Sequence, residues 1–110
     1  MITEEQVEGA IDWLRKNAKA AAKARAERIY MEEFRKTIKA NGMKLHLDKP
    51  IGAQEREAYS STEYQMHLKA MQEAIERDEY ARWMMVAEQA RIEAWRTQQA
   101  NQRAEGKAYS

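Results

Sequence analysis

Apolar residues recur every three or four positions over two long stretches of the chain, which is the spacing of one face of an α-helix. The first line runs through Val7, Ile11, Leu14, Ala18, Ala21 or Ala22, Arg25 and Ile29, then shifts by one position to Tyr30, Phe34 and Ile38. The second runs through Tyr64, Leu68, Met71 and Ile75, and resumes eight residues later as Trp83, Val86, Ala90 and Ala94. This pattern predicts an all-α chain with two long helices, and the shifts predict a gentle twist rather than a strict heptad zipper.

The first helix is predicted to span about residues 3–40. Thr3 and Gln6 have the spacing of a capping box, and acidic residues follow Thr3, where the positive end of the helix dipole favours them. At the other end, a basic last turn precedes Asn41-Gly42. Asn and Gly tolerate left-handed backbone geometry, so this pair is predicted to end the helix.

Residues 41–52 are predicted to form a connector, because Pro50 and Gly52 give its second half a turn composition. A short helix is expected over about residues 53–59. Ser60 and Glu63 have capping-box spacing and are expected to begin a second long helix over about residues 62–103. Residues 104–110 form a polar tail that is expected to fray. Two long helices with one short connector predict a single helical domain over residues 1–110, folded as an antiparallel, coiled-coil-like helical hairpin.

Residues 83–95 are apolar on more than one helix face, because Met84 or Met85, Ile92 and Trp95 form a second line beside Trp83. A hairpin offers each helix only one partner, so the surplus face predicts a homo-oligomer, a dimer or larger. In an antiparallel hairpin Trp13 is expected to approach Trp95. The predicted protein interface comprises Trp13, Trp83, Met84, Met85, Ile92 and Trp95. The alternative is a hairpin core that contains all three tryptophans.

Composition narrows the function classes. The chain has 110 residues, 34% of them charged, a net charge of +1 and no cysteine, so disulfides and thiolate metal sites are excluded. The N-terminal residues are acidic and do not resemble a signal peptide. No segment approaches the roughly 20 apolar residues that cross a bilayer. We expect a cytoplasmic protein without a membrane partner.

The segment KNAKAAAKARAER, residues 16–28, combines alanines with basic residues. Alanines at 18, 21 and 22 are expected to face the partner helix and to permit close approach. The basic residues predict a strip that contacts nucleic-acid phosphates, comprising Lys16, Lys19, Lys23 and Arg28. The alternative is a solvated face that is partly paired with acidic residues of the segment 78–93, which lies opposite in an antiparallel hairpin.

Residues suited to catalysis are sparse. His46 and His67 are the only histidines, and Glu63 with His67 offers two ligands on one helix face without a third. No phosphate-binding glycine loop or nucleophile motif is present. We therefore predict no catalytic residue, metal site or cofactor, and a protein that is not an enzyme.

Four segments carry a resemblance to a known group of proteins: residues 4–18, 26–40, 50–79 (PIGAQEREAYSSTEYQMHLKAMQEAIERDE) and 90–103 (ARIEAWRTQQANQR). They resemble small helical proteins of tailed bacteriophages and prophages, encoded in early regions among recombination and replication genes. The resemblance implies a phage protein acting in the host cytoplasm, as a non-enzymatic accessory that binds DNA or a phage or host protein of DNA metabolism. The alternatives are an adaptor or inhibitor of a host or phage protein and, third, a small structural assembly protein.

Overall fold

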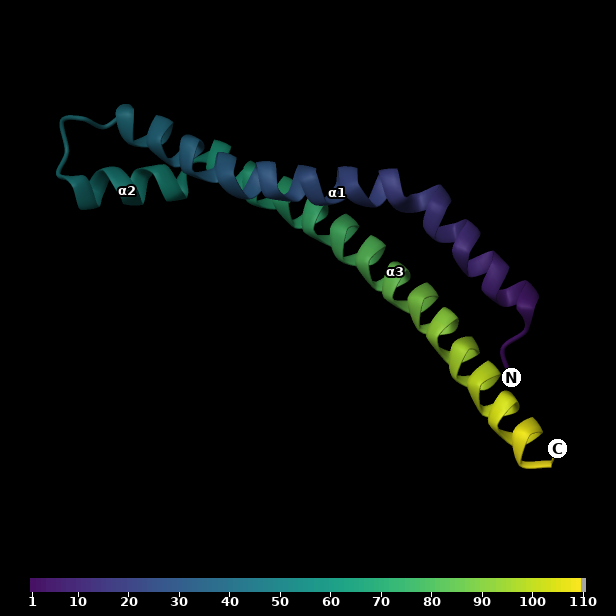
Figure 1. Cartoon of the computed structure of the whole chain (residues 1–110). Helices are drawn as coiled ribbons and strands as arrows, with labels where there is room; N and C mark the ends of the chain where they lie inside the picture. The colour runs from purple at the N-terminus through teal and green to yellow at the C-terminus, as the bar shows by residue number, and fades with distance from the viewer. Residues whose placement is uncertain (110) are drawn as a thin grey trace. The chain divides into compact units, whose positions relative to one another are not determined.

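The computed structural model describes residues 1–109, which contain three α-helices and no strand (Figure 1). Helix α1 spans Glu4–Lys44, α2 spans Ile51–Ser60 and α3 spans Thr62–Tyr109. The all-α class predicted from the apolar periodicity is confirmed.

The helices form two compact units, whereas the sequence predicts a single helical domain. Unit 1 combines residues 1–21 with the part of α3 that begins at Tyr80, and unit 2 comprises residues 22–79. In each unit a stretch of α1 runs antiparallel to a stretch of α3. In unit 1 Ile2 lies beside Gln98, and in unit 2 Arg28 lies beside Glu79. Antiparallel packing within each unit is the arrangement that a helical hairpin requires.

The start of α1 is fixed by the predicted capping box. The backbone N–H of Thr3 donates to Gln6 Oε1 at 3.0 Å, and the N–H of Gln6 donates to Thr3 Oγ1 at 3.2 Å. The preceding residue is tied to the other helix, since Ile2 N–H donates to Gln98 Oε1 and Gln98 Nε2 donates to Ile2 O. The capping box therefore gives one N–H group of the first turn, that of Gln6, a side-chain acceptor.

The predicted end of α1 at Asn41-Gly42 is wrong, because the helix continues to Lys44. No described glycine has a positive φ, so Gly42 does not act as a left-handed terminator. Its role is close packing: a Cβ on Gly42 would lie 2.9 Å from Ala58 Cβ and 3.0 Å from Ala58 Cα. The glycine is therefore explained by the contact between α1 and α2.

The connector is shorter than predicted, since only residues 45–50 separate α1 from α2. Pro50 precedes α2, and its carbonyl accepts hydrogen bonds from the N–H groups of Ala53 and Gln54, which starts the helix two residues early. The predicted cap of α3 is also displaced by one residue. Ser61, rather than Ser60, adopts the extended conformation, and its Oγ accepts a hydrogen bond from Tyr64 N–H.

The least exposed positions of α1 and of α3 alternate at spacings of three and four, which is a heptad pattern. We call these positions the seam of each helix. The sequence instead predicts apolar lines that shift in register. Polar residues occupy several seam positions, which hides the register from a search for apolar residues. In α1 the seam comprises Val7, Ala10, Leu14, Asn17, Ala21, Ala24, Arg28 and Met31; in α3 it comprises Tyr64, His67, Met71, Ala74, Asp78, Ala81, Met85, Glu88, Ile92, Trp95 and Gln99.

This register moves several predicted core residues to the surface. Ala18 and Arg25 are exposed, as are Ile11, Ile29 and Phe34. Of the alanines predicted to face the partner helix, only Ala21 lies on the seam. Among the described residues the only side chains with no exposed surface are the small ones of Ala10, Ala58 and Ala74. The core that the chain forms by itself is therefore thin.

The C-terminal tail predicted to fray is helical in the described residues, since α3 continues to Tyr109. The tail contains Ala104, Glu105, Lys107 and Ala108, whose residue types have high helix propensities. Gly106 lies inside the helix at a cost of about 1 kcal/mol relative to alanine, which these neighbours offset.

Candidate interaction surfaces

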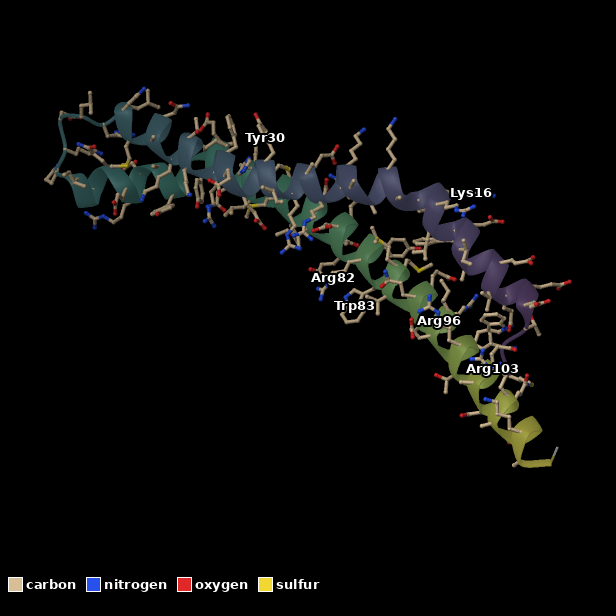
Figure 2. All side chains as sticks on the ribbon, in the orientation of Figure 1. Lys16, Tyr30, Arg82, Trp83, Arg96 and Arg103 are labelled. Carbon is tan, nitrogen blue, oxygen red and sulfur yellow. The ribbon has the colours of Figure 1, made fainter. Side chains whose placement is uncertain are left out.

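An apolar stripe follows the face of α3 that is opposite to the seam. Trp83 is 62% exposed and Val86 is 43% exposed, and Ala90 and Ala94 on the same face are also exposed. We call these four residues the outer stripe. Figure 2 shows Trp83 on the side of α3 that points away from α1. Apolar residues at spacings of three and four on an exposed face are typical of a helix that contacts a second partner.

The two apolar lines that the sequence suggests for residues 83–95 of α3 have the opposite environments from those predicted. The line of Trp83 and Val86, expected to meet α1, is exposed, whereas Met85 and Ile92 are half-buried on the seam. Met84 and Trp95 are half-buried as well. The prediction is wrong here because Ala81 and Glu88 hold seam positions. One residue is small and the other is polar, so a search for large apolar residues does not find them. The surplus apolar surface is thus smaller than predicted and centres on Trp83.

The three tryptophans are not gathered together. Trp13 and Trp95 are half-buried in unit 1, and no ring contact joins them in residues 1–109. Trp83 is separate from both, and the Arg82 guanidinium lies 5.5 Å from its ring centroid. A cation held over an indole face stabilises the exposed ring in one orientation without burying it. The alternative in which one chain buries all three tryptophans is therefore wrong.

The lysines of the basic strip are exposed. Lys16 and Lys19 lie three residues apart on one face of α1 in unit 1, whereas Lys23 lies in unit 2. Within the described part of the chain, none of the three forms an ion pair with a carboxylate. Their ammonium groups are available to an anionic ligand. Figure 2 labels Lys16 in unit 1.

Arg28, the fourth predicted member of the strip, has a different environment. Its Nε donates to Glu32 Oε1 at 2.9 Å, while Nη1 lies 3.2 Å from Asp78 Oδ2 and 2.9 Å from Glu79 Oε1. These hydrogen bonds, foremost the one to Glu32, raise the pKa of Arg28 above its ordinary value. Arg28 therefore joins α1 to α3 within unit 2. The pairing with Asp78 and Glu79 confirms the expectation that acidic residues of the segment 78–93 meet part of the basic strip.

His67, considered above as a metal ligand beside Glu63, has a structural partner. Its Nε2 lies 2.7 Å from the carbonyl oxygen of Met31, so this nitrogen carries the proton and donates to α1. The imidazole also packs at 6.0 Å from the ring of Phe34, which stacks on Tyr30. Residues 1–109 contain no group of three or more side chains placed to hold a metal ion.

A shallow open hollow of about 500 Å³ lies near the C-terminal end of α3. It is lined by Trp95, Arg96, Gln99, Ala100 and Arg103. Figure 2 shows Arg96 and Arg103 along this part of the helix. The Arg96 guanidinium pairs with Glu93 at 2.9 Å, so part of the positive charge at the hollow is already compensated.

Comparison with known proteins returns no match among family models, curated proteins or solved structures. None of the helices described has a segment both long enough and apolar enough to span a bilayer. The exposure, charge and contacts of the chain's own surfaces are therefore what indicates a function.

Proposed function

We propose that this chain is a non-enzymatic protein-interaction module that binds a helical partner through the outer stripe of α3. The observation that carries the proposal is the 62% exposure of Trp83 beside Val86. Burial of apolar surface is favourable by about 25 cal/mol per Å², and an indole is among the largest contributors at protein interfaces. The alanines that complete the stripe allow a second helix to approach closely.

The small buried core supports the same proposal. Among the described residues, the only side chains without exposed surface are those of Ala10, Ala58 and Ala74. Because the fully buried side chains are alanines, folding of one chain leaves much of its apolar surface in water. Association is the ordinary way to bury such a surface, so we propose that the chain is a homo-oligomer or binds another helical protein.

The setting of the module follows from the resemblance to phage proteins. We place it in the cytoplasm of a host cell, as an adaptor or inhibitor of a phage or host protein of DNA recombination or replication. Its length and its helical surface also suit a small assembly piece, although no contact described above favours that role.

The test compares Trp83→Ser with Met66→Ser, since both side chains are exposed residues of α3 and only Trp83 lies on the outer stripe. Tagged full-length variants are used to capture partners from cells that express the chain, and their thermal unfolding is recorded in parallel. We expect Trp83→Ser to remove partners that the Met66→Ser variant retains, with similar unfolding temperatures. Identical partners and an identical oligomeric mass for both variants would contradict the proposal.

A second candidate function is DNA binding by Lys16, Lys19 and Lys23. It is favoured by the exposure of these three lysines and by the absence of carboxylate partners for them within residues 1–109. Exposed lysine side chains commonly contact nucleic-acid phosphates, and such contacts supply much of the affinity of DNA-binding proteins. The two functions use different helices and are compatible in one molecule.

A further inference from the structure

We infer that the partner on the outer stripe is a second copy of this chain, with its α3 antiparallel to the first about a two-fold axis at Ala90. The inference rests on the proposed function, because it names the occupant of the same surface. It is carried by the order of side-chain sizes along the stripe.

The stripe is self-complementary under an antiparallel two-fold. Val86 and Ala94 lie four residues on either side of Ala90, and Trp83 and Thr97 lie seven residues on either side. In the dimer, Trp83 faces Thr97 of the partner copy and Val86 faces Ala94 of the partner copy. Each large side chain therefore meets a small one. A parallel pair would place Trp83 against Trp83 and leave Ala94 against Ala94, which combines overpacking with a void.

Ala90 lies at the centre of this arrangement. An alanine on the axis permits the helices to approach to about 8 Å, the lower end of helix packing distances. At the edge of the stripe, the Thr97 hydroxyl already donates to the carbonyl of Glu93 at 3.1 Å. The threonine can therefore present its methyl group to an indole without leaving a polar group unsatisfied.

The composition of the stripe also suits a second copy. Trp83, Val86, Ala90, Ala94 and Thr97 are all uncharged in a chain in which 34% of residues are charged. The centre of the inferred contact therefore takes no charged side chain out of water, and Arg82, Glu93 and Arg96 lie at its flanks.

The test uses the absence of cysteine from the chain, which allows single cysteines to report on proximity. In the inferred dimer Ala90→Cys lies on the axis, where the two Cβ atoms approach closely enough for a disulfide. Val86→Cys and Ala94→Cys are expected to cross-link with each other in a mixture and not alone. Ala20→Cys, an exposed alanine of α1, is the matched control.

We expect light scattering to give a mass twice that of one chain. Under mild oxidation we expect covalent dimers from Ala90→Cys and from the Val86→Cys with Ala94→Cys mixture, at least tenfold faster than from Ala20→Cys. The double variant Trp83→Ser/Val86→Ser should shift the mass to that of one chain. Its helix content by circular dichroism should remain at the wild-type value.

Two results would overturn the inference. A wild-type chain that remains a monomer, while Trp83→Ser still removes captured partners, shows that the stripe binds another protein and leaves the proposed function standing. A dimer in which Ala90→Cys cross-links no faster than Ala20→Cys uses another face. If, in addition, Trp83→Ser changes neither the mass nor the captured partners, the proposed function fails as well.

Discussion

Gly42 on α1 lies directly against Ala58 on α2, with the glycine Cα so near that an added Cβ would come within 2.9 Å of the Ala58 Cβ. Ala58 has no exposed surface, and the added methyl group would also lie 3.0 Å from Ala58 Cα, so the α2 backbone must move to accommodate it. We expect Gly42→Ala to lower the free energy of unfolding by about 1–3 kcal/mol, as overpacking does elsewhere. Urea unfolding followed by circular dichroism measures the change.

Gly9 provides the matched control. It lies in the interior of the same helix, and no atom lies within 4 Å of the position that a Cβ would take, so an alanine there meets only solvent. Gly9→Ala should raise stability by roughly 0.5–1 kcal/mol, because alanine restricts the unfolded chain and favours the helix. A Gly42→Ala variant as stable as the Gly9→Ala variant would show that the contact between α1 and α2 is not tight.

The sequence was sufficient for those parts of the fold that depend on local chemistry. Alanine, glutamate, lysine and arginine favour long helices, and the cap made by Thr3 and Gln6 needs only four consecutive residues. Gly42 shows the limit of such reasoning. The same residue suits a helix end and a close helix contact, and only the position of Ala58 distinguishes the two.

The seam could not be read from apolar residues because polar ones complete it. Asp78 and Glu88 hold α3 seam positions, and Arg28 holds one on α1. Each of these charged residues is tolerated because it has an ionic partner. Arg28 pairs with Asp78, and Glu88 Oε2 lies 3.8 Å from Arg91 Nη1. A search for large apolar residues therefore places Trp83 on the seam, although the smaller Ala81 holds that position. The candidate stripe was therefore visible in the sequence, but its exposed face was not.

Thr3→Ala should weaken the start of α1. The substitution removes the acceptor for Gln6 N–H while Gln6 Oε1 still accepts from residue 3, so half of the capping box is lost. We expect a loss of about 1 kcal/mol in unfolding free energy. Thr37→Ala, at an exposed interior position of the same helix, is the control and should be neutral or slightly stabilising. Equal effects of the two variants would mean that the cap contributes nothing.

Arg28→Gln should destabilise unit 2, because Glu32, Asp78 and Glu79 then remain close together without their shared cation. The difference in unfolding temperature between wild type and Arg28→Gln should become smaller in 1 M NaCl, because salt screens the repulsion between the carboxylates. Because the pKa of Arg28 is raised, its contribution is fully present below its ordinary pKa and is lost only in strong alkali. The difference in unfolding temperature between wild type and Arg28→Gln should therefore be constant from pH 7 to pH 9. Arg35→Gln, at an exposed position, is the control in thermal unfolding.

Charge reversal of the lysine strip tests DNA binding. We expect a variant with Lys16→Glu, Lys19→Glu and Lys23→Glu to lose affinity for labelled DNA in fluorescence anisotropy. Each phosphate contact that is lost should reduce the slope of log affinity against log salt by about 0.7–0.9. The control reverses the same number of charges at exposed lysines elsewhere, namely Lys36, Lys44 and Lys69. Since both variants have the same net charge, a loss confined to the first shows that the position of the lysines matters. Equal losses of affinity in the two variants would show that DNA binding is a general effect of net charge. If the wild type does not bind DNA, the outer stripe of α3 remains the proposed functional surface.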